Sequence, residues 1–357
     1  MFHPMARFVI IALALVAIAF AARVHFVELR EGELDAGRDI HALWQDGQRL
    51  LNHENPYARV LGGSDDLNRK YATYFPVFYV LSAASQVVFK TYPSFILFWR
   101  CVFFVFYAGI ALLLAFPFYR RQWYAACAFA ILLWLFNRWT LKSVELVHID
   151  FLAILPLVAS LLLLDRHRRT SLLLLGLSLA IKQLAIFLVP IYLIWAWNKA
   201  EPRLRIGDTI RAAFWIAIIP ALVSLPFLVI GPHALIKSIL FSAVRGDEFR
   251  MPADSLDKVL EWSPRRGKAI MAAMMCLVYV MVYEKRVNRF TGMLLVMTLF
   301  AAFNRIWFRQ YEVWPIALLP LVVLDNCTCP PPGNANRITE HVADAAPRDR
   351  SDAVVMR

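Results

Sequence analysis

The sequence predicts an all-α polytopic membrane protein, a bundle of about ten transmembrane helices, on three observations. Of its 357 residues, 60% are hydrophobic and only 18% are charged, whereas soluble domains are about half apolar and about a quarter charged. Several apolar windows are long enough to cross the roughly 30 Å hydrocarbon core of a bilayer. The net charge of +12 lies in short loops between apolar segments, so the positive-inside rule explains it and nucleic acid is not an expected partner.

The first apolar segment, residues 7–27, is longer than the core of a signal peptide, and we expect an uncleaved helix. An acidic, polar loop follows at residues 28–93 and is expected to carry interfacial helices. Residues 74–89 belong to this loop, because about 16 apolar residues are short for a span. The later spans are expected at residues 94–118, 123–137, 144–164, 171–197, 211–230, 268–283, 290–303 and 311–324.

Basic loops set the predicted topology. Residues 119–122, 165–169, 199–211 and 284–289 are all expected to be cytoplasmic. This requires that residues 171–197 break into two short helices near Gln183 or Pro190, which is tolerated where irregular backbone lines a protein cavity.

The protein is then expected in the plasma (inner) membrane, with both termini on the cytoplasmic side. Four stretches face outward: residues 28–93, a short turn at 138–143, residues 231–267 and residues 304–310. Residues 1–325 form one transmembrane domain, and residues 326–357, rich in proline and small polar residues, form a disordered cytoplasmic tail.

Several classes of site are not expected. The sequence has no P-loop, dinucleotide-binding, HExxH or GxSxG motif. Its five cysteines suggest neither disulfides nor a zinc site.

Ionisable residues at the mouth of a span are costly to place there and are therefore functional candidates. The acids that follow the first span include Asp35 and Asp39, and a carboxylate in this position can act as a general base toward a hydroxyl group. A solvated helix exit is the alternative.

Two further groups lie on the predicted outer face. Asp150 needs a partner, which we expect to be Lys182 or an arginine; His148 lies two residues before it, a spacing that does not share a helix face, so no joint metal site is expected. Lys182 is a candidate to neutralise a phosphate, with an ion pair or a lysine snorkelling to the interface as alternatives. Arg245 and Arg309 are candidates for bidentate phosphate binding, with lipid headgroups as the alternative.

The order of these motifs resembles GT-C glycosyltransferases, most nearly the polyprenyl-phosphate-mannose-dependent mannosyltransferases of bacteria and more distantly the first GPI mannosyltransferase. Residues 39–44, 55–57 (Asn-Pro-Tyr) and 74–76 (Tyr-Phe-Pro) resemble the first loop of these enzymes, and residues 148–150 the polar start of a middle helix. Residues 180–185 with Pro190 resemble the Lys-Gln segment of the dolichyl-phosphate-glucose glucosyltransferases, and residues 308–315 a C-terminal motif. The chain departs from the family in having Arg309 where a histidine is common and no tight Asp-x-Asp pair.

The resemblance implies a transferase that moves a hexose, mannose in the nearest relatives, from a polyprenyl-phosphate donor to a lipid or glycan acceptor outside the cytoplasm, with inversion. Asp39 would be the general base. The donor phosphate would be bound by Arg309, Lys182, Arg245 and His148. Supporting or acceptor-binding roles would fall to Asp35, Asp150, Tyr57, Tyr74, Gln310 and Tyr311. No cofactor is expected, with a divalent cation as the alternative; a lipid or solute transporter and a transferase of another lipid-linked sugar are the alternative functions.

Overall fold

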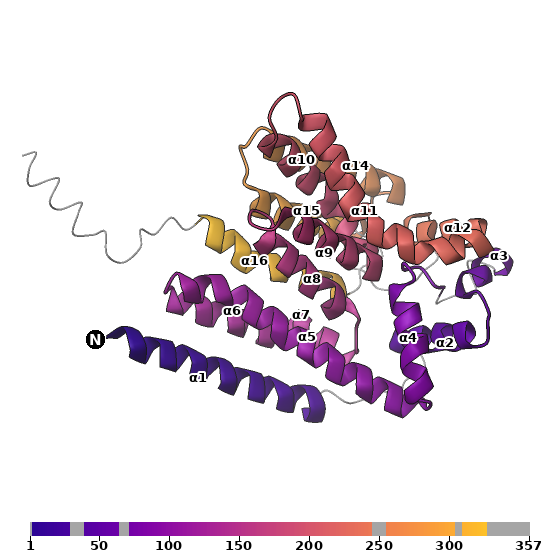
Figure 1. The fold of residues 1–357 in the computed structure, drawn as a ribbon, viewed down its shortest axis with the longest axis horizontal. Helices are drawn as coiled ribbons and strands as arrows, with labels where there is room; N and C mark the ends of the chain where they lie inside the picture. The colour runs from indigo at the N-terminus through magenta and orange to yellow at the C-terminus, as the bar shows by residue number, and fades with distance from the viewer. Residues whose placement is uncertain (1, 29–38, 64–70, 245–254, 304–308, 327–357) are drawn as a thin grey trace, which may run out of the picture.

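The computed structural model describes residues 2–28, 39–63, 71–244, 255–303 and 309–326. Within these ranges the chain is helical and has no strand (Figure 1). The first part of the chain forms α1 (Phe2–Arg23), η1 (Val24–Glu28), α2 (Asp39–Leu51), η2 (Pro56–Ala58), α3 (Arg59–Gly62), α4 (Val77–Val88), α5 (Tyr92–Arg120), α6 (Tyr124–Phe136) and α7 (Arg138–Glu145). The second part forms α8 (Asp150–Leu163), α9 (Arg168–Ile181), η3 (Gln183–Leu188), α10 (Val189–Lys199), α11 (Arg205–Ile230), α12 (Pro232–Val244), α13 (Leu256–Val259), α14 (Pro264–Tyr283), α15 (Arg289–Phe303), η4 (Arg309–Glu312) and α16 (Val313–Asn326).

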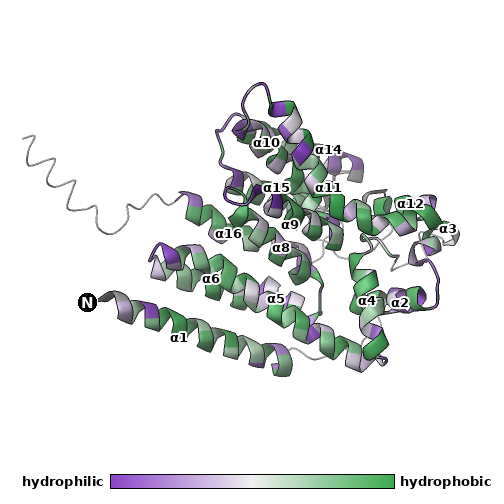
Figure 2. Ribbon diagram, viewed as in Figure 1, coloured by the Kyte–Doolittle hydropathy of each residue, from purple (hydrophilic) through white to green (hydrophobic). Residues whose placement is uncertain are grey.

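Four of the described helices are long and apolar enough to cross a membrane: α1 with η1, α5, α11 and α14. The pair α6–α7, bent by 40°, makes a fifth if it forms one span. Figure 2 shows these helices as largely apolar along their length, as the sequence predicts. The remaining predicted spans are helices of 11–15 residues, shorter than the roughly 20 residues that a full span needs, so the total of about ten stays a prediction.

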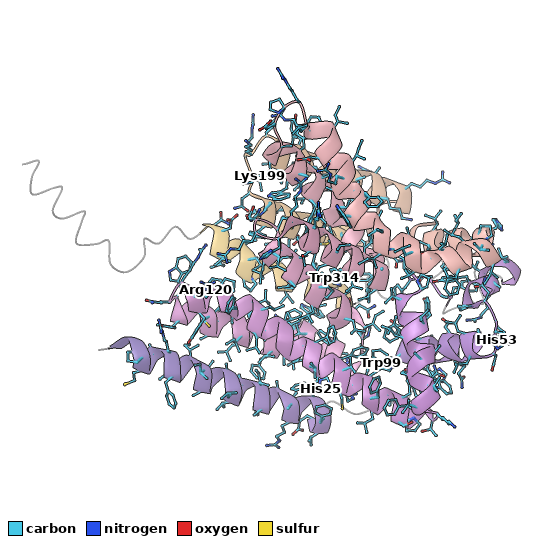
Figure 3. The ribbon with its side chains drawn as sticks, viewed as in Figure 1. His25, His53, Trp99, Arg120, Lys199 and Trp314 are labelled. Carbon is cyan, nitrogen blue, oxygen red and sulfur yellow. The ribbon has the colours of Figure 1, made fainter. Side chains whose placement is uncertain are left out.

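The helices form two groups that meet where α5 packs against α8 and where α16 contacts both groups. In one group α6 packs against α1 and α5; in the other, α9 packs between α8 and α11, and α14 and α15 pack together. Helix α16 contacts α5, α6 and α8 as well as α15. The last helix therefore lies between the two groups, and the fully buried Trp314 lies near the centre of the view in Figure 3.

Helices α2 and α4 form a tight pair within the stretch predicted as the first outer loop. Ser82 and Gln86 of α4 donate hydrogen bonds to the carbonyl oxygens of Leu43 and Trp44, both at 2.9 Å. Gly47 makes this approach possible, because a Cβ there would lie 2.3 Å from Gln86 Nε2. With 12 residues, α4 is too short to span a bilayer alone, in line with the prediction for residues 74–89.

The predicted break in residues 171–197 is confirmed. Helix α9 ends at Ile181, Lys182 has an extended backbone (φ −146°, ψ 117°), and η3 leads into α10. A neighbouring helix stabilises this irregular stretch, since Tyr279 of α14 donates a hydrogen bond to the carbonyl oxygen of Phe187 at 2.8 Å.

Two local predictions were wrong. Residues 138–143 are not a turn but part of α7, whose start is capped by Asn137 accepting a hydrogen bond from the Trp139 amide. The helix predicted at residues 144–164 begins only at Asp150, because Val147 has a left-handed backbone (φ 54°) that ends the preceding helical turn.

The four basic loops lie together at one end of the helices. A continuous series of side-chain bonds connects them and the end of α16: Arg121 to the Leu324 carbonyl, Asn326 to Asn288, Arg289 to Asp165, and Arg168 to Asp208. Figure 1 shows the N-terminus, the α5–α6 turn and the end of α16 on the same side. This arrangement is the one that the topology prediction requires, although which side of a membrane these loops face remains a prediction.

Candidate functional site

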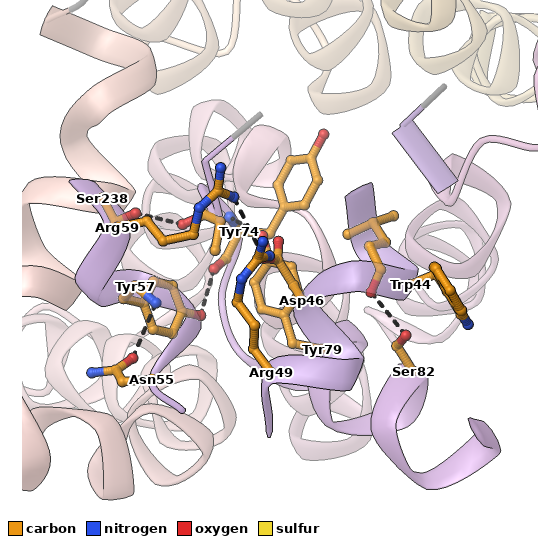
Figure 4. Close-up of polar contacts among 12 residues, drawn as sticks. Trp44, Asp46, Arg49, Asn55, Tyr57, Arg59, Tyr74, Tyr79, Ser82 and Ser238 are labelled. Carbon is orange, nitrogen blue, oxygen red and sulfur yellow. Dashed lines mark hydrogen bonds and ion pairs between the residues drawn. The ribbon is translucent and has the colours of Figure 1, made fainter. Parts of the chain in front are cut away.

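At the end of the bundle away from the basic loops, residues 71–76, hereafter the pinned segment, connect α3 to α4. Side chains from four elements bind its backbone, and Figure 4 shows those of Tyr57, Tyr79 and Ser238. The bonds are Ser238 Oγ to the Ala72 carbonyl at 2.6 Å, Gln183 Nε2 to the Thr73 carbonyl at 2.6 Å, Tyr57 Oη to the Tyr74 carbonyl at 2.8 Å, and the Tyr74 amide to Tyr79 Oη at 3.1 Å. The pinned segment has no regular hydrogen-bonding pattern of its own, so these four partners fix the position of Tyr74.

The turn before the pinned segment is set by its own sequence. Asn55 caps η2 by accepting a hydrogen bond from the Tyr57 amide at 3.0 Å, and Pro56 takes the first position of that helix. Proline is favoured there because its fixed φ suits a helix start. The Asn-Pro-Tyr motif thus aims the buried Tyr57 at the pinned segment.

A buried ion pair lies beside Tyr74. Lys182 Nζ donates to both carboxylate oxygens of Asp150 at 2.7 Å, and the exposed fractions of the two residues are 3% and 0%. The indole of Trp314 donates a third hydrogen bond to Asp150 Oδ1 at 2.7 Å. Three converging donors are what a buried carboxylate needs to remain charged.

Two tyrosines and a histidine surround this pair. The rings of Tyr74 and Tyr311 each lie 5.8 Å from Lys182 Nζ, a distance at which a cation is attracted to an aromatic face. His148, also buried, has Nδ1 3.9 Å from Asp150 Oδ2. The site therefore combines one cation, one carboxylate and aromatic walls drawn from α8, the α9–η3 break, the pinned segment and η4.

Asp39 lies in α2 and acts on the same group through its charge. It occupies the first turn of that helix, where the positive end of the helix dipole favours a carboxylate. Burial, and after it the charges of Asp39, Tyr311 and Asp150, raise the pKa of Tyr74 well above its ordinary value. The charge of Asp39 thus acts on the phenol that also lies beside Lys182.

The structure brings together most of the residues that the sequence singled out. Tyr57, Tyr74, His148, Asp150, Lys182 and Tyr311 are connected by the contacts above, and Gln310 is buried next to Tyr311. Asp39 is linked to them through its charge, which acts on Tyr74. Asp35 and Arg245 lie outside the described residues. Arg309 begins η4, but its side chain lies outside what the structure describes.

Two residues of this region were missed as site residues. Trp314 appeared in the sequence only as part of the motif at residues 308–315. Its indole N–H could have identified it, since a buried tryptophan needs a hydrogen-bond acceptor, and that acceptor is Asp150. Asp46 is one of several acids in residues 28–93. It is the buried one among the described acids of that stretch, with an exposed fraction of 2%, and it forms an ion pair with Arg49.

The chemistry open to this arrangement is that of charge and proton transfer. Asp150 already balances the charge of Lys182, so a further anion would meet one remaining N–H of the ammonium and not an uncompensated cation. Asp39 supplies a carboxylate that can accept a proton. Among the described side chains, no three of the His, Cys, Asp or Glu type come together as a metal site would require.

Comparisons with known proteins assign no family. No family model matches the chain, and no curated protein matches its sequence.

Proposed function

We propose that this protein is an integral-membrane glycosyltransferase that moves a hexose, mannose in the first instance, from a polyprenyl-phosphate donor to a hydroxyl group of a lipid or glycan acceptor. The observation that supports this best is the cluster of Tyr74, Lys182, Asp150 and Tyr311 at the end of the bundle opposite the basic loops, where the charge of Asp39 also acts on Tyr74. A carboxylate, a fixed cation and aromatic walls at one mouth of an apolar bundle suit a sugar carried on a lipid phosphate.

In the proposed reaction, the acceptor oxygen attacks the anomeric carbon of the donor sugar. The bond from that carbon to the phosphate oxygen breaks, and its electron pair leaves with the polyprenyl phosphate. Asp39 takes the proton of the acceptor hydroxyl, and one displacement inverts the anomeric centre.

Fixed donors near the leaving phosphate would stabilise its growing negative charge. Among the described residues, Lys182 would contribute its one remaining N–H, and His148 is the second candidate. Arg245 and Arg309, proposed from the sequence, would supply the uncompensated positive charge. The hydrogen bonds from Lys182 and Trp314 hold Asp150, so Asp150 serves to fix Lys182 rather than to accept a proton.

The test of the proposal is the Asp39→Asn variant. We expect its transfer of labelled mannose from polyprenyl-phosphate mannose to fall by about 10²–10⁴-fold, the usual contribution of a general base. Its melting temperature in detergent and its retention of the lipid donor should match those of the wild type. The matched control is Glu54→Gln, which removes an exposed carboxylate just beyond α2 and should leave transfer unchanged. Near-normal turnover by Asp39→Asn would refute the assignment of the base.

A transporter is the second candidate, and one observation favours it. A helix broken at Lys182, beside a buried ion pair, is a form that transporters use at their binding sites. Purified protein in liposomes separates the two functions: appearance of a glycosylated acceptor supports transfer, whereas movement of the sugar-lipid between leaflets without a product supports transport.

A further inference from the structure

Asp46 is a buried carboxylate that the proposed reaction does not use. It lies in α2, two helical turns after Asp39, and therefore on the same side of the helix. Its Oδ1 is 2.5 Å from Arg49 Nη1 and 3.9 Å from Arg59 Nη1, so it connects α2 to α3. Figure 4 shows both guanidinium groups directed at Asp46.

Two contacts link Asp46 and its arginines to the phenols that hold Tyr74. Arg59 follows η2, and its amide donates a hydrogen bond to the carbonyl oxygen of Tyr57; α4, which carries Tyr79, packs along α2. Burial, and then the charge of Asp46, raise the pKa of Tyr57; burial, then Tyr57 and Asp46, raise the pKa of Tyr79. The rings of Tyr57 and Tyr79 contact each other edge to face, with centroids 5.8 Å apart. One phenol donates to the carbonyl oxygen of Tyr74 and the other accepts from its amide.

We propose that Asp46 is a positioning residue: its contacts with Arg49 and Arg59 set the two phenols that hold the backbone of Tyr74, and thereby place the Tyr74 ring against Lys182. The placement of Tyr74 follows from the structure alone, whereas its effect on turnover rests on the proposed function. The carboxylate acts through Tyr57 and Tyr79 and does not touch the reacting groups.

The ionisation of Asp46 makes this role testable. Burial raises the pKa of Asp46 from 3.8 to about 6, although Arg49 and Arg59 act in the opposite direction. Among the described residues, the groups that face it are Arg49 on its own helix, Arg59 from α3, Tyr57 from η2 and Tyr79 from α4. Neither phenol titrates near pH 6. His148 lies beside Asp150 in the same site as Tyr74, so the part of a transition that disappears in Asp46→Asn is the part that reports Asp46.

The sign of the effect on stability follows from the raised pKa. A carboxyl group whose pKa is higher in the folded than in the unfolded state contributes its stability fully below pH 3.8 and loses it as the pH rises to about 6. At neutral pH the ionised carboxylate therefore costs stability. Asp46→Asn should melt at the same temperature as the wild type or higher at neutral pH, whereas removal of a purely structural ion pair would lower the melting temperature.

The direct test places 3-fluorotyrosine at position 74 and follows its ¹⁹F resonance from about pH 5 to about pH 8, the range in which a carboxyl with this raised pKa titrates. In the wild type the resonance should shift with a midpoint near pH 6. In Asp46→Asn the shift with this midpoint should be absent, and any shift that remains should disappear when His148→Gln is added. The control Glu54→Gln should behave as the wild type. A resonance that does not move in the wild type, or that moves equally in the wild type and in Asp46→Asn, would overturn the proposal.

The rate of sugar transfer provides a second, independent test of the role of Asp46. Asp46→Asn should lower kcat by about ten- to a hundredfold, as misplacement of a positioning group does, and should abolish the limb of the pH profile near pH 6. An unchanged kcat would contradict the link from Tyr74 to turnover. If the wild type transfers no sugar from any polyprenyl-phosphate donor, the proposed function fails, while the ¹⁹F result still decides whether Asp46 positions Tyr74.

Discussion

At the scale of single residues, the bond between Lys182 and Asp150 depends on burial. Two charges removed from water are held by mutual attraction and by the indole of Trp314, and loss of either charge leaves the other without compensation in an apolar interior. The pair is thus costly to break from one side only.

The first prediction concerns Lys182→Met. Removing one partner of a buried pair costs about 3–5 kcal/mol, so the melting temperature of the detergent-solubilised protein should fall markedly. The double variant Lys182→Met/Asp150→Leu should recover most of this loss, since no charge remains buried.

The control for that experiment is the exposed pair of Arg286 and Glu284 at the basic end, whose side chains are 73% and 43% exposed. Arg286→Ala should change stability by less than about 1 kcal/mol. Wild-type melting of Lys182→Met would show that the pair carries little of the fold's stability.

The partnership of Lys182 with Asp150 could be predicted from the sequence, because an acid at this depth needs a cation and few are available. The third partner could not. Trp314 lies in an apolar run, and which of the eleven tryptophans reaches Asp150 depends on how α16 docks against α8. The burial of Asp46 could not be predicted either, since it depends on how α4 and η2 pack against α2.

At the scale of helices, the close approach of α9 and α11 depends on one glycine. A Cβ at Gly176 would lie 2.4 Å from the carbonyl oxygen of Ile216, which is backbone and cannot move aside without shifting α11. Gly207, at the start of α11, has no atom within 4 Å of its Cβ position.

Gly176→Ala and Gly207→Ala should therefore change stability in opposite directions. The first should destabilise the protein by about 1–3 kcal/mol through overpacking. The second should stabilise it by up to about 1 kcal/mol, because alanine is the better helix former. Thermal unfolding of the two variants in the same detergent measures the difference, and equal stability of the two would contradict the packing argument.

The helices themselves were largely predictable, because long apolar windows leave few alternatives. The break at Lys182 was also predicted, from the need to keep all basic loops on one side. The start of α8 was not, since residues 144–164 read as one apolar run and the left-handed conformation of Val147 has no signal in its residue type. Valine is disfavoured there, so the conformation follows from tertiary packing: α7 packs against α6 and η4, and α8 against α5 and α9.

At the scale of the whole molecule, the basic loops and the candidate site lie at opposite ends. Figure 3 places Arg120 and His53 on opposite sides of the view. If the positive-inside rule holds, the basic end is cytoplasmic and Asp39 faces outward.

Cysteine labelling tests this orientation. In a variant without the native cysteines, His53→Cys should react with a membrane-impermeant maleimide in intact cells, and Arg166→Cys should react only after permeabilisation. Both positions are exposed, so access depends on the side of the membrane alone. The reverse pattern would contradict the predicted topology and place the candidate site in the cytoplasm.

The position of α16 has a consequence for the synthesis of the protein. Trp314 follows its acceptor Asp150 by 164 residues, and Tyr311 immediately precedes the same helix. A ribosome delivers α8 and the Lys182 break to the membrane long before it delivers α16, so during translation Asp150 has its lysine but lacks its indole. The charged centre is completed only when α16 inserts between the two groups of helices, so a nascent chain that stalls before residue 313 leaves the Asp150 carboxylate buried without one of its three hydrogen bonds.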